Sequence, residues 1–479
     1  MSYNSEDYFL SREFKNLLNK FNGVDDNSVY VVFDPDELMD VAEYYYNSGD
    51  RERALSIIDN TLSVYPGSVS PLLFKARIAL LDENDVNKAE SITELIDDKT
   101  DLEYTYMKAE IMLFQGQSML ADNYLEDRFN NISAEDSDYF AIDSSALFLD
   151  YNCVNIAEKW LKRSGDTECA EYKEQAARIS VEKGEYERSK QLFNELIDKD
   201  PFSIHYWNAL ASTQFFNNNI EDSIQSSEYS IAIDPENSAA LLNKANGLYN
   251  LGNFSEALKY YKRYNKQCPN DENGEMLIGF CHLLLDEYEE AITHLEKAEK
   301  LLPPDSRNLV DIYKDWAFAL CRMGQMEESA AVLDKTDNLD CDHNEIMVYR
   351  GNLLLGCGYL EDAKECFMQA LRASGFSPAI VMKIAITIYE SGDLQLAYKM
   401  FRNLYDNNRD WNDGYAYFAA CCYDLGKTDE FLAGVKKAAE NTPLELKLLF
   451  GKLFPKDMQP SEYYQYLINK MRIGGKDVF

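Results

Sequence analysis

The fold of this chain is decided by two consecutive stretches, PFSIHYWNALASTQFFNNNIEDSIQSSEYSIAIDP (residues 201–235) and NSAALLNKANGLYNLGNFSEALKYYKRYNKQCP (residues 237–269). Each has a small residue in its first half, a polar turn, a second small residue and a closing proline. Pro201, Pro235, Pro269 and Pro303 are each 34 residues apart. A fixed period of this length is the signature of a repeat architecture.

Outward from these stretches, most of the chain divides into about twelve units of the same period. Within a unit, positions 8 and 20 are usually Ala, Gly or Ser, position 15 is usually Gly, and position 24 is large. The unit from 138 departs from this pattern, because Asn152 stands where glycine is expected, and the last unit departs at positions 20 and 24. The units start near residues 35, 69, 102, 138, 170, 204, 238, 272, 310, 344, 378 and 412.

This spacing predicts a helical hairpin in each unit. Small residues at positions 8 and 20 let two helices approach closely, and we expect the large residue at position 24 to fill the space toward the next unit. The glycine near position 15 suits a helix C-cap with a left-handed backbone. A proline near position 32 ends the second helix. One hairpin cannot bury its own apolar face, so the units must stack.

The pattern resembles the tetratricopeptide repeat, over roughly residues 35–445. The chain is also similar to uncharacterised bacterial proteins with many such repeats. The resemblance implies an all-α fold, a right-handed superhelical solenoid of about twelve hairpins with capping helices. We therefore expect an N-terminal cap or lead-in at 1–34, the array at 35–445, and C-terminal capping helices at 446–479.

Composition limits the partners. The chain has 479 residues, and its 47 Lys and Arg against 83 Asp and Glu give a formal net charge of −36. Such a charge repels nucleic acid and anionic lipid, so we expect neither nucleic acid nor membrane, and a protein or peptide partner that is basic or neutral. The acidity either keeps a long helical stack soluble or forms an acidic groove for a basic partner. Residues 431–479 differ, with a net charge of +3.

No secretory signal precedes the repeats, which favours a cytoplasmic location. Ten cysteines are present, none with CxxC spacing, and most lie in apolar helical patterns. In that compartment they are expected to act as small buried residues and not as a disulfide framework.

The sequence favours no catalysis and no cofactor. It contains no phosphate-binding glycine loop of the GxxxxGK[ST] type and no GxSxG nucleophile motif. Cys281 with His282, and Cys341 with His343, have atoms that suit zinc, but neither pair has a second closely spaced pair of ligands. Packing is the simpler account of these residues, and no metal is expected.

The resemblance also implies that the first helix of each hairpin lines a concave groove with its positions 2, 5, 6, 9, 12 and 13. In the units from 204 and 238 these positions are rich in amides and aromatics, which can bind the backbone and side chains of an extended peptide. Ordinary polar lining of a wide groove is the alternative. The candidate partner-binding residues are His205, Asn208, Ser212, Phe215, Asn243, Asn246, Tyr249 and Asn250.

Two devices of the family are not matched. The carboxylate clamp for chaperone tails needs Lys, Asn and Arg at set positions, and of these only Asn243 is present; the asparagine ladder of sugar-transferase arrays needs Asn repeatedly at position 9, which only Asn246 and Asn352 supply. We therefore expect a non-catalytic scaffold or adaptor that binds a protein or peptide in its groove. The alternatives are a regulatory subunit of an enzyme complex and a self-associating assembly factor.

Overall fold

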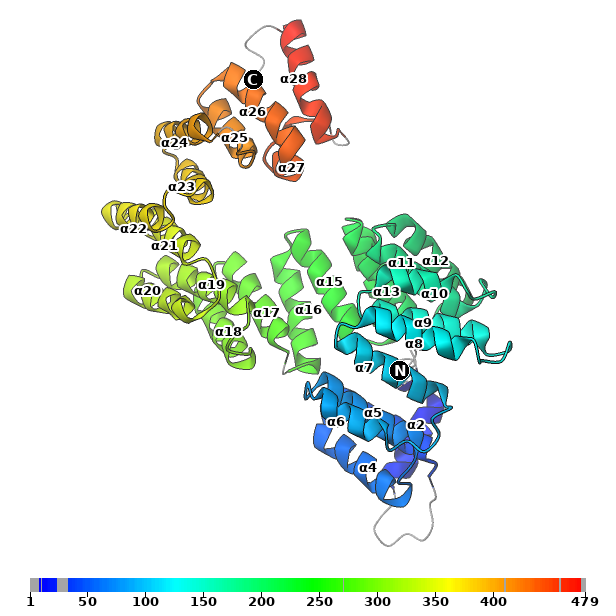
Figure 1. The fold of residues 1–479 in the computed structure, drawn as a ribbon. Coiled ribbons are helices and arrows are strands. Elements are labelled where there is room, and N and C mark those ends of the chain that lie inside the picture. The colour runs from blue at the N-terminus through cyan, green and yellow to red at the C-terminus, as the bar shows by residue number, and fades with distance from the viewer. Residues whose placement is uncertain are drawn as a thin grey trace. The chain divides into compact units, whose positions relative to one another are not determined.

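The computed structural model describes residues 8–9, 11–23, 33–269, 271–408, 411–455 and 458–474. Parts of the expected N-terminal cap (1–7, 10 and 24–32) and the last five residues of the expected C-terminal cap lie outside the described residues. The described residues form helices and no strands, which confirms the predicted all-α solenoid of helical hairpins (Figure 1). The chain divides into two compact units, Met1–Gln267 and Cys268–Phe479.

The first unit contains α2 and seven hairpins, in each of which two successive helices pack against each other. Its helices are α2 (Arg12–Asn22), α3 (Pro35–Asn47) with α4 (Arg51–Val64), α5 (Val69–Leu81) with α6 (Val86–Thr93), α7 (Leu102–Phe114) with α8 (Ser118–Phe129), α9 (Ser137–Asp150) with α10 (Val154–Leu161), α11 (Ala170–Glu182) with α12 (Tyr186–Lys199), α13 (Ile204–Phe216) with α14 (Ile220–Ile233), and α15 (Ser238–Asn250) with α16 (Phe254–Gln267).

The second unit contains five hairpins and the C-terminal helices. Its helices are α17 (Glu272–Leu284) with α18 (Tyr288–Leu301), α19 (Asn308–Arg322) with α20 (Met326–Asp334) and the 3-10 turn η1 (Lys335–Asn338), α21 (His343–Gly356) with α22 (Leu360–Ala373), α23 (Pro378–Glu390) with α24 (Leu394–Asn407), α25 (Tyr415–Asp424) with α26 (Thr428–Asn441), then α27 (Pro443–Phe450), η2 (Gly451–Leu453) and α28 (Pro460–Gly474).

Each hairpin turns on a residue with a left-handed backbone. Glycine fills this place at position 15 in eight hairpins, with φ between +68° at Gly426 and +93° at Gly392. Asn152, Asn218 and Asp286 occupy the same position with φ of 57°, 59° and 60°, and Asn84 follows one residue later in its unit with φ of 53°. Asn and Asp are the side chains that best tolerate this conformation. Asn152 therefore adopts the left-handed turn conformation that glycine adopts at this position in most other hairpins.

Close helix packing explains the small residues. A Cβ atom placed on Gly351, at position 8, would lie 2.4 Å from Cε1 of Phe367, at position 24 of the same hairpin, and one placed on Gly279 would lie 3.0 Å from Leu295. The large residue at position 24 thus lies against position 8 of its own hairpin. The sequence predicted a contact toward the next unit and did not predict this one. Ala257 and Ala291, at position 20, are fully buried.

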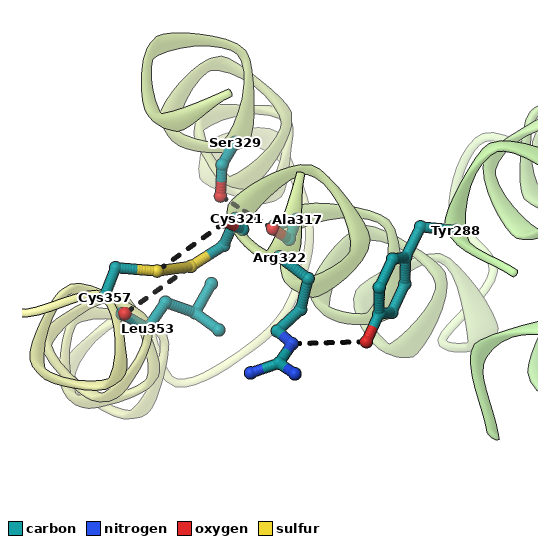
Figure 2. Close-up of a disulfide and its surroundings, with 7 residues drawn as sticks. All are labelled: Tyr288, Ala317, Cys321, Arg322, Ser329, Leu353 and Cys357. Carbon is teal, nitrogen blue, oxygen red and sulfur yellow. Dashed lines mark hydrogen bonds between the residues drawn. A yellow bond between two sulfur atoms is a disulfide. The ribbon is translucent and has the colours of Figure 1, made fainter. Parts of the chain in front are cut away.

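Serine at position 20 adds a polar link across the hairpin. The Ser329 hydroxyl donates to the Ala317 carbonyl at 2.8 Å, as Figure 2 shows, and the Ser223 hydroxyl donates to the Ala211 carbonyl at 2.7 Å. Both serines are buried, so these bonds satisfy hydroxyl groups that would otherwise be costly to bury. Serine can therefore replace alanine at this position without widening the hairpin.

Aromatic residues pack on the first and last described hairpins. Phe14 of α2 is fully buried and lies in one cluster with Val41 of α3 and Ile58 of α4. At the other end, α28 packs on α26 and α27, and the rings of Phe454 and Tyr463 stack with centroids 3.7 Å apart. Because α27 starts at Pro443, the expected boundary at residue 446 falls inside a helix. The division into lead-in, array and cap stays a prediction.

Two cysteines depart from the expectation for this residue type. Cys321 of α19 and Cys357, which follows α21, form a disulfide between neighbouring hairpins (Figure 2). They are 36 residues apart, close to one repeat period, so stacking brings them together. The expectation that all ten cysteines act as unbonded packing residues is wrong for this pair. It describes Cys421 and Cys422, which are buried and form no disulfide among the described residues.

Candidate binding surface

In each unit most first helices lie next to the first helix of the following hairpin. Thus α5 contacts α3 and α7, α9 contacts α7 and α11, and α15 contacts α13. Within each unit, each second helix packs on the first helix of the next hairpin, as α12 does on α13 and α14 on α15. Among the described helices, successive second helices do not pack closely together. The first helices therefore form the inner face of each unit, where the predicted binding residues lie.

The structure brings the eight predicted residues onto α13 and α15 but does not leave them equally accessible. Asn208 is buried: its Nδ2 donates to Oδ1 of Asn237 at 3.0 Å, whereas its own Oδ1 has no hydrogen-bond partner in the described part of the chain. Oδ1 of Asn246 accepts the hydroxyl of buried Tyr261 at 2.7 Å. These two amides hold helices together and are less available to a partner.

The other predicted residues are half-buried or exposed. Asn243 lies between the two helices, with its Nδ2 3.4 Å from the backbone oxygen of Asn208, and the Ser212 hydroxyl donates to Oδ1 of Asn243 at 3.5 Å. His205 Nε2 lies 3.0 Å from Oε1 of Glu174 on α11. The accessible set comprises His205, Ser212, Phe215, Asn243, Tyr249 and Asn250.

A hollow next to Ser212 was missed by the sequence reasoning. It has a volume of about 190 Å³ and lies where α9, α11 and α13 meet, with Phe193 of α12 behind them. A signal was present, because Leu149, Arg178, Val181 and Glu182 occupy the inner positions 9, 12 and 13 of the two preceding units. The hollow is lined by Leu149, Arg178, Val181, Glu182, Phe193, Ala209, Ser212 and Thr213.

Carboxylates outnumber cations on the inner face of the first unit. Burial raises the pKa of Asp40 and of Glu43, and the negative charges around them act in the same direction. Asp40 accepts the hydroxyl of Tyr8 at 2.8 Å, and Asp143 accepts that of Tyr106 at 3.2 Å. In the described part of the chain no Lys or Arg forms an ion pair with Asp40, Glu43 or Asp143. In the second unit, burial and the neighbouring Asp311 raise the pKa of Asp315 to about 6.

The two histidines considered for zinc, His282 and His343, contact other side chains. His282 and His294 stack with ring centroids 5.5 Å apart, and their Nδ1 atoms lie 2.5 Å from carboxylates of Glu287 and Glu275. The Sγ of Cys341 lies 3.9 Å from Nδ1 of His343. No group of three His, Cys, Asp or Glu among the described residues is placed to hold a metal ion.

No helix among the described residues has the length and apolar character needed to span a bilayer.

Comparison with known proteins gives two matching family models. The model described as "Anaphase-promoting complex, cyclosome, subunit 3" matches residues 216–298, and the model described as "Tetratricopeptide repeat" matches residues 346–375. Protein IFIT1 homolog B of Homo sapiens is 30% identical over 132 residues, which is 24% of this chain. The chain spans 27% of the length of that curated relative.

Several solved structures are similar in part. A tetratricopeptide repeat protein from Parabacteroides merdae is 16% identical with a TM-score of 0.38, over 52% of this chain and 97% of that one. MamA from Desulfovibrio magneticus is 15% identical with a TM-score of 0.33, over 36% and 94%. YrrB, described as a TPR protein with an unusual peptide-binding site, is 15% identical with a TM-score of 0.33, over 38% and 91%.

The described residues form seven hairpins in the first unit and five in the second, with small residues where the two helices cross, and this defines a protein of the α-helical repeat class. The 34-residue period and the match of residues 346–375 identify the class further. These findings support a tetratricopeptide-repeat protein.

Proposed function

We propose that this chain is a non-catalytic scaffold or adaptor that binds a protein or peptide on the inner face of its first unit. The observation that carries the proposal is the row of accessible polar and aromatic side chains on α13 and α15, from Ser212 and Phe215 to Tyr249 and Asn250. A face built on rigid, packed helices binds an extended segment without first folding itself, which lowers the entropic cost of association.

The proposed partner is basic or neutral, because the inner face carries the carboxylates described above and the chain as a whole carries a charge of −36. A cytoplasmic location is part of the same proposal. The Cys321–Cys357 disulfide argues against a cytoplasmic location, since disulfides persist mainly in oxidising compartments.

Affinity capture from the native host followed by mass spectrometry tests the proposed function. The groove variant replaces Asn243 and Asn250 of α15 with arginine, which adds bulk and positive charge to the inner face. We expect specific partners of the wild type to be depleted about tenfold or more, because like charges across an interface are costly. Asn246 is kept, since its removal would leave the buried Tyr261 hydroxyl without a partner.

A matched control carries the same two Asn→Arg changes at Asn60 of α4 and Asn194 of α12, which are exposed on second helices. The control is expected to retain the wild-type partners. Equal loss from both variants, or retention by both, contradicts the assignment of the inner face.

A second function, self-association, is favoured by a different observation. On α27, Leu444 is 82% exposed and Leu448 is 81% exposed, and exposed Lys447 and Lys452 flank them. Contiguous exposed apolar side chains mark interaction sites, and a basic apolar face suits the acidic array of a second copy of this chain.

Sedimentation velocity over a range of protein concentrations tests self-association. We expect concentration-dependent oligomers from the wild type and a monomer from the Leu444→Gln, Leu448→Gln variant. Leu360→Gln with Leu396→Gln, at two other exposed leucines, is the control and should behave as the wild type. A wild type that stays monomeric at every accessible concentration rules this function out.

A further inference from the structure

We infer that the hollow between α9, α11 and α13 holds one large apolar side chain of a peptide in which lysine or arginine neighbours that residue. The inference rests on the proposed function and names the chemistry of the segment bound at that surface. It is carried by the volume of the hollow, by its lining, and by the charges at its rim.

The volume limits the occupant to one side chain. A cavity of about 150 Å³ accommodates a benzene molecule, so a hollow of about 190 Å³ has room for one leucine, isoleucine or phenylalanine side chain. An occupied hollow would place that side chain at the junction of three successive hairpins, where each contributes part of the wall.

Part of the wall of the hollow is apolar. Leu149 and Phe193 are 6% and 2% exposed, and Val181 and Ala209 are the other apolar residues of the lining. The two hydroxyl groups are engaged within the protein: Thr213 donates to the Ala209 carbonyl at 2.8 Å, and Ser212 donates to Asn243. Apolar and polar side chains therefore contribute about equally to the lining, and the apolar part of the wall favours burial of an aliphatic or aromatic side chain against it.

The rim of the hollow is negative. The guanidinium of Arg178 lies 2.6 Å from a carboxylate oxygen of Asp150, which offsets the positive charge that this lining residue contributes. Glu182 is exposed and in the described part of the chain forms no ion pair. Asp143 and Glu171, on the same faces of α9 and α11, are also exposed. Residues that flank the anchoring side chain in the peptide meet this excess of carboxylates, so positive side chains there are favoured.

Selection of random twelve-residue peptides displayed on phage, with the purified full-length protein as bait, tests the inference. We expect enriched peptides to contain one Leu, Ile or Phe with Lys or Arg within two residues of it. Measured with synthetic copies of the enriched peptides, Ala209→Phe should weaken binding about tenfold to a hundredfold, because it fills the hollow with a side chain of the size that the peptide would bury.

Two matched controls accompany the selection. Ala330→Phe makes the same change at a half-buried alanine of a second helix, α20, away from the inner positions, and should leave affinity within about twofold of the wild type. Glu182→Lys should weaken binding and reduce its dependence on salt, whereas Asp198→Lys, an exposed position on α12, should do neither. Thermal denaturation of each variant confirms that it is folded.

The outcomes separate this inference from the proposed function. Some peptides could bind Ala209→Phe as tightly as the wild type but fail to bind the Asn243→Arg, Asn250→Arg groove variant. That result would show that the hollow is not the anchor site, while the proposed binding on the inner face would still stand. Enriched peptides without a basic residue near the anchoring side chain contradict the proposed preference for Lys or Arg at the rim of the hollow. Failure to enrich any peptide contradicts both proposals.

Discussion

Replacing Trp160 with alanine is expected to lower the free energy of unfolding by about 3–5 kcal/mol, the range for removing a large aromatic side chain from a core. Trp160 is fully buried, and its ring lies edge-on to Phe129 and Phe140 with centroids 5.6 and 5.9 Å away. Its indole nitrogen also donates to Asp122 at 2.8 Å. Removing the indole therefore leaves a cavity, and the Asp122 carboxylate, which is 5% exposed, loses one of its hydrogen-bond donors.

Urea denaturation followed by circular dichroism measures this loss, and hydrogen exchange locates it in α8–α10. Local readout matters because hairpins in an array contact only their neighbours. Trp207→Ala is the control. Trp207 is half-buried, and its ring stacks on that of Tyr229 with centroids 4.6 Å apart. Loss of this stacking contact should lower the free energy of unfolding by about 1.5 kcal/mol or less, in addition to the loss of the area that the ring buries. Equal effects from the two tryptophans would mean that Trp160 is not the core residue that the structure shows.

Replacing Ala257 with leucine is expected to destabilise the chain by about 1–3 kcal/mol through overpacking. Ala257 occupies position 20 of the hairpin formed by α15 and α16 and is fully buried. The distances at Gly351 and Gly279 show how little room exists where two helices of a hairpin cross. Three extra carbon atoms at such a crossing force the helices apart, or force neighbouring side chains out of their preferred rotamers.

The matched control is Lys259→Leu, two residues further along α16 at an exposed position. Because leucine and lysine have similar helix propensities, this change should alter stability by no more than about 0.5 kcal/mol. Thermal and urea denaturation of both variants give the comparison. If Ala257→Leu proves neutral, the crossing point of this hairpin lies elsewhere than position 20.

The hairpins themselves could be predicted from sequence because the period depends on local chemistry. Small residues at crossings and a left-handed residue at each turn are required by sterics, and they recur whatever the partner is. The last hairpin shows the limit of this reasoning. Phe431 stands where the repeat has a small residue, and Gly434 makes the close approach instead, since a Cβ there would lie 3.0 Å from that of Ala419. A fixed spacing cannot anticipate such a substitution.

The candidate surface could be predicted only in outline. Inner positions follow from the repeat, so α13 and α15 were identified, but burial depends on contacts between units. Asn208 and Asn246 have the same side chain as Asn250, yet the first two bond to Asn237 and Tyr261. The hollow beside Ser212 was missed for the same reason: its walls come from three hairpins, and no single unit contains its pattern. The disulfide was missed because compartment, and not repeat spacing, was used to judge the cysteines.

The left-handed residue at every turn has a consequence for how such a chain can change over time. Only Gly, Asn and Asp occupy these turns, and only small residues occupy most of the crossings, so few residue types are acceptable at the positions that shape a hairpin. The inner positions 2, 5, 6, 9, 12 and 13 are not among them. Specificity for a partner can therefore diverge residue by residue on this scaffold while the backbone that presents those residues stays the same.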